Sequence, residues 1–192
     1  MLCDWEIKEL VDKHGMIDPF IDHQINRDSA GNKVISYGLT SFGYDIRLST
    51  KFKVFNNRAG GIIDPLDFQD NLLLDEAGDY CIIPPNCYLL GSTIESFKMP
   101  NNVVADCVGK STLARCGLIL NVTPLEPGWE AQSLTLEISN ATPLPAKVYA
   151  NMGIGQLRFY RGSNPLNTYK NRATGPGKYQ MQGTEPVTAR IN

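Results

Sequence analysis

The side chains best suited to binding phosphate groups are gathered in one short segment, residues 109–118. Four of them lie there between two glycines: Lys110, Ser111, Thr112 and Arg115. Backbone N–H groups, hydroxyls and a lysine can together hold a polyphosphate. The Gly-Lys-Ser start is also found in P-loops, but that motif needs a glycine where this chain has Val104. A polyphosphate site and an ordinary turn with solvated charges are therefore equally good interpretations of these residues.

A second candidate is the carboxylate of Glu137, in the apolar run 134–139. Strand alternation separates three apolar side chains from three polar ones on the opposite face: Leu134, Leu136 and Ile138, against Thr135, Glu137 and Ser139. A glutamate whose polar face is covered by a ligand or a neighbouring segment can act as a general base. A solvent-facing carboxylate is the more common outcome, and alternation alone does not decide between the two.

The elements that must position these residues are predicted to be mainly β-strands. Short apolar runs recur between turns rich in Gly, Pro and Asn: 44–48, 52–55, 80–83, 88–91, 103–108, 118–122, 134–139 and 154–160. Many short strands of this kind indicate a distorted barrel or a jelly-roll-like sandwich. Two helical exceptions are expected: a short N-terminal helix capped by Asp4 and stopped by Gly15, and a turn within 110–116.

We expect one domain over residues 1–192, because chains of ~150 to 250 residues commonly fold around a single core. From about residue 162 to residue 192 the composition changes to a polar run around Gly175-Pro176-Gly177. This segment, called the arm below, has too little apolar surface to form a core of its own. We expect a mobile, extended arm that stays loose or folds over a ligand or a neighbouring subunit.

The composition narrows the classes of function. A net charge of −2 argues against a general nucleic-acid binder but is compatible with a small phosphorylated ligand. No apolar run approaches the ~18 residues that span a bilayer, and the acidic N-terminus is unlike a signal peptide. The five cysteines are odd in number and scattered, which is typical of reduced thiols. We therefore expect a cytoplasmic protein that binds neither nucleic acid nor membranes.

Three ordered motifs within residues 109–140 closely resemble the dCTP deaminase family. The family pattern runs G-[KR]-S-[ST]-x-x-R-x-G-L, then V-T-x-x-x-P-x-W, then T-L-E; this chain matches it at 109–118, 122–129 and 135–137. The likeness extends to the N-terminal helix and to residues 44–48, 155–157 and 178–183. It implies deamination of dCTP to dUTP and ammonia, which supplies dUTP for thymidylate synthesis. It also implies a homotrimer, related in fold to the trimeric dUTPases, with active sites at subunit interfaces.

The resemblance also assigns roles to particular residues. Glu137 would be the general base, assisted by Ser111 and Arg115. The nucleotide and its phosphates would be contacted by Lys110, Ser111, Thr112, Leu113, Ala114 and Arg115. Backbone groups would read the cytosine edge at Thr135 and Leu136. The site would be completed by Gln156 and, from the arm, by Tyr169, Lys178 and Gln182, with Gln180 as a competitor for the role of Gln182.

Two departures from the family pattern precede the catalytic strand. Ala131 stands where the family usually has glycine after Trp-Glu. One extra residue also lies between Trp129 and Glu137. These departures predict an altered hairpin ahead of the strand, such as one with a bulge.

The sequence predicts a reaction without zinc. Zinc-dependent nucleobase deaminases carry an H-x-E and a P-C-x-x-C motif, whereas this chain has only His14 and His23 and no Cys-x-x-Cys. No metal-ligating residue is predicted, because Mg²⁺ is expected only with the bound triphosphate, held by phosphate oxygens and water. The resemblance further implies dTTP as a feedback inhibitor.

Two alternatives remain open. The first is a dUTPase, or a bifunctional enzyme that also breaks the phosphoanhydride bond. The Gly-x-Ile-Asp motif associated with that reaction is missing from 122–129, which offers only Glu126. The second is a non-catalytic nucleotide sensor, which would not need a base at Glu137.

Overall fold

The structure, a computed structural model, describes residues 1–56 and 60–191. Its main helix is α1 (Asp4–His14), and the two other helical segments are single turns, η1 (Asp70–Leu72) and α2 (Ser111–Ala114). The strands are β1 (Ile17–Asp18), β2 (Gln24–Arg27), β3 (Lys33–Thr40), β4 (Gly43–Phe55), β5 (Leu73–Ala77), β6 (Tyr80–Ile83), β7 (Tyr88–Thr93), β8 (Ser96–Lys98), β9 (Val103–Gly109), β10 (Leu118–Asn121), β11 (Glu130–Ala131), β12 (Thr135–Asn140), β13 (Ala146–Tyr149) and β14 (Gly153–Arg161). None of the described helices has the length and apolar character needed to cross a membrane.

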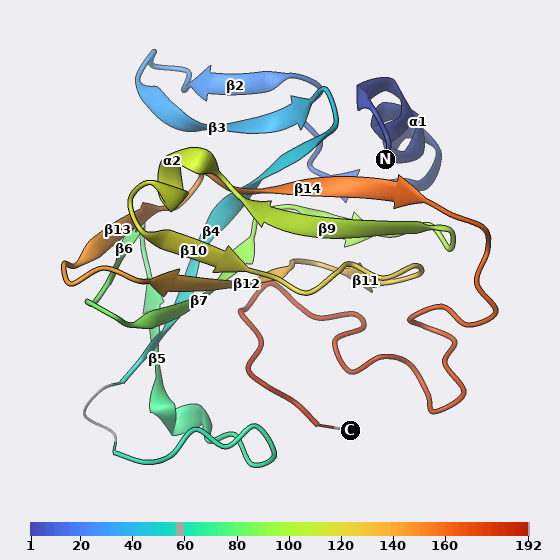
Figure 1. Cartoon of the computed structure of the whole chain (residues 1–192). Helices are drawn as coiled ribbons and strands as arrows, with labels where there is room; N and C mark the ends of the chain where they lie inside the picture. Colours follow the sequence, from blue (N-terminus) through green and yellow to red (C-terminus); the bar gives the residue numbers. More distant parts are fainter. Residues whose placement is uncertain (57–59, 192) are drawn as a thin grey trace.

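The strands form one large curled sheet and two small ones (Figure 1). The nine-stranded sheet has the order β10-β12-β7-β4-β14-β9, with β2, β3 and β5 joined beside this path. The small sheets are β1-β8-β11 and β13-β6, and all the strand pairs are antiparallel. This arrangement confirms the prediction of a mainly β fold of the distorted-barrel type.

Strand β4 is the central element that organises the sheet and the core. It pairs with β3, β5, β7 and β14, and its side chains Tyr44, Ile46 and Leu48 are completely buried. The predicted runs 44–48 and 52–55 both lie within this one strand, and the other predicted runs also fall in strands. The strands outside the predicted runs include β1 and β11, which are two residues long, and also β3, an eight-residue strand with several apolar residues.

The N-terminal helix begins differently from the prediction, which was wrong about its cap. Cys3 is the N-cap residue, and its backbone N–H donates a hydrogen bond to Oε2 of Glu6 (3.1 Å). Asp4 is instead the first helical residue. Gly15 ends the helix as expected, in the left-handed conformation (φ 63°), and its N–H donates to the carbonyl of Val11 (2.8 Å). Glu6 thus makes the return bond of a capping box to Cys3, which sets the start of the helix one residue before Asp4.

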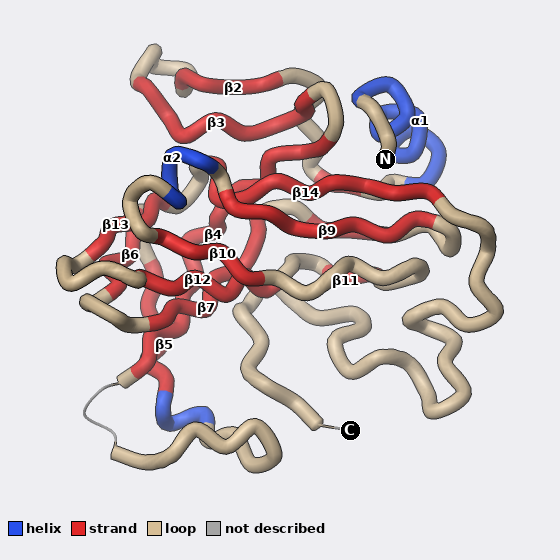
Figure 2. Tube along the Cα trace, in the orientation of Figure 1, coloured by secondary structure: helices blue, strands red, loops and turns tan. Residues whose placement is uncertain are grey.

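The arm after β14 has no helix or strand in its described part and runs back over its own chain (Figure 2). Tyr169 N–H donates to the carbonyl of Pro127 (2.8 Å), and Met181 N–H donates to that of Glu130 (2.7 Å). The arm thus covers the segment that leads from β10 into β12. The sequence predicted an arm that stays loose or that folds over a ligand or a neighbouring subunit. In the structure the arm folds over segments of its own chain.

Candidate active site

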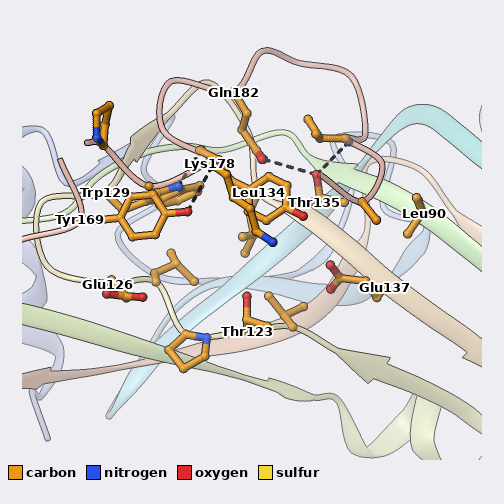
Figure 3. A pocket seen from close by; sticks show the side chains of 18 of the residues that line it. Leu90, Thr123, Glu126, Trp129, Leu134, Thr135, Glu137, Tyr169, Lys178 and Gln182 are labelled. Carbon is orange, nitrogen blue, oxygen red and sulfur yellow. Dashed lines mark hydrogen bonds between the residues drawn. The ribbon is translucent and has the colours of Figure 1, made fainter. Parts of the chain in front are cut away.

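A cavity of about 730 Å³ lies between β7, β12, the segment 122–129 and the arm (Figure 3). Several predicted site residues line it together, although they come from distant parts of the chain: Thr135, Glu137, Tyr169, Lys178 and Gln182. Its other polar lining includes Thr123, Glu126 and Arg172, and its apolar wall includes Phe55, Leu90 and Trp129. The cavity therefore joins the catalytic strand to the arm within one chain.

Glu137 extends from β12 toward this cavity (Figure 3). Its neighbours on the adjoining strands are Leu90 of β7 and Asn121 of β10. Its own strand neighbours Leu136 and Ile138 are 0% and 1% exposed, which confirms that Glu137 lies on the face opposite the core. Of the two interpretations open from the sequence, the structure supports a covered carboxylate rather than one facing solvent.

The environment of Glu137 makes its carboxyl group suited to proton transfer. Burial raises the pKa of Glu137 from 4.5 to about 7, because charge is unfavourable away from water. Its Oε2 atom is buried and has no hydrogen-bond partner in the described chain. A carboxyl group with a pKa near neutrality can accept a proton and return it, which is what general acid–base catalysis requires.

Two titratable groups that the sequence analysis missed lie near the Glu137 carboxylate. Burial raises the pKa of Tyr88 to about 12, and the nearby charge of Glu137 adds to this effect. Burial and Glu137 likewise raise the pKa of Cys107 to about 12. The only sequence signal for either was its place in a predicted strand. Both groups stay neutral over the range in which Glu137 titrates, so Glu137 is the one of the three that changes charge near neutral pH.

The arm residues Tyr169 and Lys178 enter the cavity beside Trp129. The hydroxyl of Tyr169 accepts a hydrogen bond from the N–H of Tyr179 (3.1 Å), and the indole N–H of Trp129 donates to the carbonyl of Tyr179 (3.0 Å). Gly177 packs against the ring of Tyr169 so closely that an added Cβ would lie 2.1 Å from it. These contacts hold the aromatic side of the cavity in place.

Gln182, not Gln180, is the glutamine that reaches the cavity. Its side chain is 7% exposed, and its Nε2 donates to the carbonyl of Ser133 and, at 3.4 Å, to Oγ1 of Thr135. Gln180 bonds instead to backbone groups of Gly128 and Glu130, both at 3.4 Å. The structure therefore places Gln182, and not its competitor Gln180, at the cavity beside Thr135.

Glu126 and Arg172 face each other at the cavity and form a charged pair. The guanidinium group of Arg172 donates to both carboxylate oxygens of Glu126 and lies 4.6 Å from the centre of the Tyr169 ring. The sequence analysis did not single out Arg172, because a lone arginine in a polar arm carries no pattern. Its pairing engages Glu126, the one acid that the segment 122–129 offers for a second reaction.

The remaining predicted site residues lie outside this cavity. The carbonyl and amide groups of Leu136 belong to β12, but its side chain faces the core. Leu113 is also buried, whereas the other residues around α2 are exposed: Ser111, Thr112, Ala114 and Arg115. The backbone N–H of Arg115 donates to the carbonyl of Ser111 (3.1 Å), but its guanidinium group makes no hydrogen bond or ion pair with the described residues. The structure of one chain therefore separates Glu137 from Ser111 and Arg115, its predicted assistants.

Lys110 and Gln156 meet each other at a third place, around the buried carboxylate of Asp45. Lys110 forms an ion pair with Oδ2 of Asp45, and Gln156 Nε2 donates to Oδ1 (3.1 Å). Gln24 Nε2 donates to Oδ2 at 2.7 Å. In the sequence, Asp45 stands out only as an acid in the middle of an apolar run. In the structure, its carboxylate is the shared acceptor for the side chains of Lys110, Gln156 and Gln24.

Metal-binding groups do not come together in the described residues. No cluster of three or more His, Cys, Asp or Glu side chains has an arrangement that could hold a metal ion there. The cysteines Cys3, Cys81, Cys87, Cys107 and Cys116 form no disulfide.

A β scaffold with a carboxyl group of raised pKa, in a cavity lined by the arm, is an arrangement suited to acid–base chemistry. The model of the dCTP deaminase-like family matches residues 1–162. A dCTP deaminase of Herpetosiphon aurantiacus is 53% identical over 181 residues, covering 94% of each chain. Those of Acinetobacter baumannii (strain AYE) and Chlamydia felis are 50% identical over 177 residues, covering 92% of each chain. The chain belongs to the dCTP deaminase-like family.

A solved structure supports the fold. The crystal structure of 2′-deoxycytidine 5′-triphosphate deaminase from Agrobacterium tumefaciens matches with a TM-score of 0.62 at 21% sequence identity. The match covers 86% of this chain and 49% of the other, so this chain spans about half the length of that one. At this identity the likeness concerns the fold alone.

Proposed function

We propose that this chain is a dCTP deaminase, which converts dCTP and water to dUTP and ammonia. Curated relatives of that name, 50–53% identical over more than nine-tenths of the chain, support the activity. The observation that carries the chemistry is the carboxyl group of Glu137, which borders the cavity, has a buried Oε2 atom without a hydrogen-bond partner and has a pKa raised to about 7. This group can act as a base and as an acid at the same pH, as hydrolytic deamination requires.

The chemistry needs one group that moves protons between water and the substrate. Ionised Glu137 accepts a proton from the water that attacks C4 of the cytosine ring. It delivers that proton to N3 of the ring. The same carboxylate then takes the proton of the new C4 hydroxyl and passes it to the amino group, which leaves as ammonia. The C4–N bond breaks as the C4–O bond is completed, and the triphosphate is unchanged. The polar groups of Thr135 and Gln182 line the same cavity as Glu137 and are suited to orienting the cytosine ring.

The site is completed, in our proposal, by a second copy of the chain in a homotrimer. Ser111 and Arg115 are exposed on and beside α2, away from the cavity of their own chain. A cation brought from another copy would lower the pKa of Glu137 and stabilise negative charge on the tetrahedral intermediate. The family resemblance of residues 109–118 supports this arrangement.

The triphosphate would be bound by the arm together with this second copy. Lys178 and Arg172 are the described cations that line the cavity. We propose that Mg²⁺ enters with the triphosphate, held by phosphate oxygens and water, and that the reaction does not use zinc. We also propose dTTP as a feedback inhibitor that competes for this pyrimidine nucleotide site, and a cytoplasmic location, in keeping with the free cysteines.

The pairing of Glu126 favours a deaminase over a bifunctional enzyme. A second hydrolysis, at the α-phosphate, would need a carboxylate free to activate another water. Glu126 borders the cavity, but both of its oxygens accept hydrogen bonds from Arg172. A nucleotide sensor is also disfavoured, because binding alone does not require a carboxyl group tuned to titrate near neutrality.

The decisive experiment is to incubate the protein with dCTP and Mg²⁺ and to separate the nucleotides by chromatography, while ammonia and pyrophosphate are measured in parallel. We expect dUTP and ammonia in equal amounts and no pyrophosphate. Equal release of ammonia and pyrophosphate would show a bifunctional enzyme. Absence of dUTP would refute deamination.

A further inference from the structure

The segment between β11 and β12, residues 132–134, is bound to the arm from both of its sides. Gln132 N–H donates to the carbonyl of Gln182 (2.9 Å), and the side chain of Gln182 donates back to the carbonyl of Ser133. The hydroxyl of Ser133 donates to the carbonyl of Gly183 (2.8 Å). This segment lies between Trp129 and Glu137, where the chain is one residue longer than the family pattern. The register of β12 against β7 is continuous, so the extra length makes no bulge in the catalytic strand.

Ser133 is the residue of this segment whose hydroxyl depends on the arm. Its side chain is completely buried, and a buried hydroxyl without a partner is costly. The partner that it has is a backbone carbonyl some fifty positions further along the chain, |i−j| = 50. Ser133 therefore links the core to the arm through its hydroxyl, while its carbonyl accepts the side chain of Gln182.

The same part of the arm makes two further hydrogen bonds, both partly buried, that fix its direction. The hydroxyl of Ser92, which is 0% exposed, donates to the carbonyl of Thr184 (2.9 Å). Val187 N–H donates to Oγ1 of Thr135 (3.0 Å). Thr135 thus receives hydrogen bonds from both Gln182 and Val187, and it shares its strand face with Glu137, two residues further on. The position of the arm at 182–187 is thereby coupled to the wall that carries the base.

We propose that Ser133 is a positioning residue for the deamination of dCTP, acting through Gln182. Its hydroxyl and carbonyl hold residues 182–183 so that the Gln182 amide lies against Thr135 at the cavity. Ser133 itself does not line the cavity, so its effect reaches the substrate through the arm. This inference rests on the proposed function and adds to it a contact that the general family pattern does not specify.

The first test is Ser133→Ala in the full-length protein. The loss of one buried hydrogen bond should lower kcat/KM for dCTP by about threefold to tenfold. The loss should appear mainly in KM, because closing the arm over the nucleotide becomes less favourable. The pH dependence of kcat should not move, since the surroundings of Glu137 are kept. Ser96→Ala is the matched control, because Ser96 also donates to a backbone carbonyl, that of Asp18 (3.0 Å), but not to the arm.

A double-mutant cycle tests whether Ser133 acts through Gln182. dCTP binding is measured by calorimetry for Ser133→Ala, Gln182→Ala and the double variant, each in a Glu137→Gln background that prevents turnover. We expect the double variant to bind no more weakly than Gln182→Ala alone. If the two substitutions weaken dCTP binding independently, so that their factors multiply, the proposal is overturned. Wild-type kcat/KM in Ser133→Ala, or an equal loss of kcat/KM in Ser96→Ala, would overturn it as well.

Amide hydrogen exchange tests the role of Ser133 in holding the arm without depending on the activity of the enzyme. The amides of Gln132 and Val187 should exchange faster in Ser133→Ala than in the wild-type protein, while amides of β4 should be unchanged. A wild-type protein that makes no dUTP would refute the proposed function. Unchanged exchange at Gln132 and Val187 would refute the role of Ser133 in holding the arm.

Discussion

The ammonium group of Lys110 and the carboxylate of Asp45 form an ion pair in which the two side chains are 13% and 4% exposed. The pair joins the residue that precedes α2 to the central strand β4. Because Gln24 and Gln156 donate to the same carboxylate, Asp45 is the shared acceptor of a buried polar network. In a single chain Lys110 thus holds the α2 segment in place.

Replacing Asp45 by alanine should destabilise the protein strongly. The change leaves the charge of Lys110 buried without its partner and removes the acceptor of two amides. We expect the free energy of unfolding to fall by about 3 kcal/mol or more, measured by urea denaturation. Asp22→Ala is the control, because Asp22 pairs with Lys8 on the surface, and it should leave stability nearly unchanged. Equal effects of the two substitutions would contradict this account of Asp45.

Glu137→Gln should abolish turnover while preserving the fold and nucleotide binding. The amide keeps the size of the side chain but cannot accept a proton from water. Positioned acid–base groups contribute about 10²- to 10⁴-fold, so kcat should fall by that factor. Steady-state kinetics measure the loss, and calorimetry with dCTP checks binding. Glu9→Gln, on the exposed part of α1, is the matched control and should keep wild-type kcat; near-normal kcat in Glu137→Gln would remove Glu137 from the role of base.

The activity should decline in acid with a midpoint set by Glu137. Its pKa is raised to about 7 by burial, and only the ionised form accepts a proton from water. Burial raises this pKa and the cation proposed from a second copy lowers it again, so we expect kcat/KM for dCTP to fall in acid with a midpoint above 4.5 and no higher than about 7, approaching tenfold per pH unit. Assays between pH 5 and 9 with a fixed Mg²⁺ concentration measure this limb. An acid limb centred near 4.5, the ordinary value for glutamate, would contradict the assigned burial.

Stability provides an independent check on the same pKa. Between pH 4.5 and about 7 the folded protein holds the Glu137 proton more tightly than the unfolded chain does. Raising the pH through this range therefore lowers the stability of the wild-type protein relative to Glu137→Gln. Urea denaturation of both proteins at pH 5 and pH 8 measures this difference, which should grow toward pH 8. A difference that shrinks would mean that the pKa is lowered instead.

Gly177→Ala should disturb the arm without unfolding the core. A Cβ at this position would lie 2.1 Å from the Tyr169 ring, so the ring or the arm must move. We expect kcat/KM for dCTP to fall at least about tenfold, the scale of misplacing a substrate-binding group. Gly162→Ala is the control within the arm, since an added Cβ there meets nothing within 4 Å. Equal activity of the two variants would show that the packing of Tyr169 does not matter for the site.

The sequence by itself determined the main strands of the large sheet and the face of β12 on which Glu137 lies. Apolar runs between turn residues predicted the strands, because burial on a sheet acts on residues that are close in the chain. Alternation placed Glu137 opposite Leu136 and Ile138, and the motifs around it indicated the family. Strands such as β1 and β11 were not predictable, because pairing with β8 rather than their own two residues defines them.

Only the tertiary structure decided what surrounds these residues. The pKa of Glu137 depends on burial beneath segments from distant parts of the chain, and no local pattern reports that burial. The choice of Gln182 over Gln180 depends on where the returning arm meets Ser133 and Thr135. Likewise, Lys110 lies beside Asp45 rather than in the cavity because the sheet brings them together across 65 positions, |i−j| = 65. Periodicity is a property of neighbours in sequence, whereas desolvation and ion pairing arise from neighbours in space.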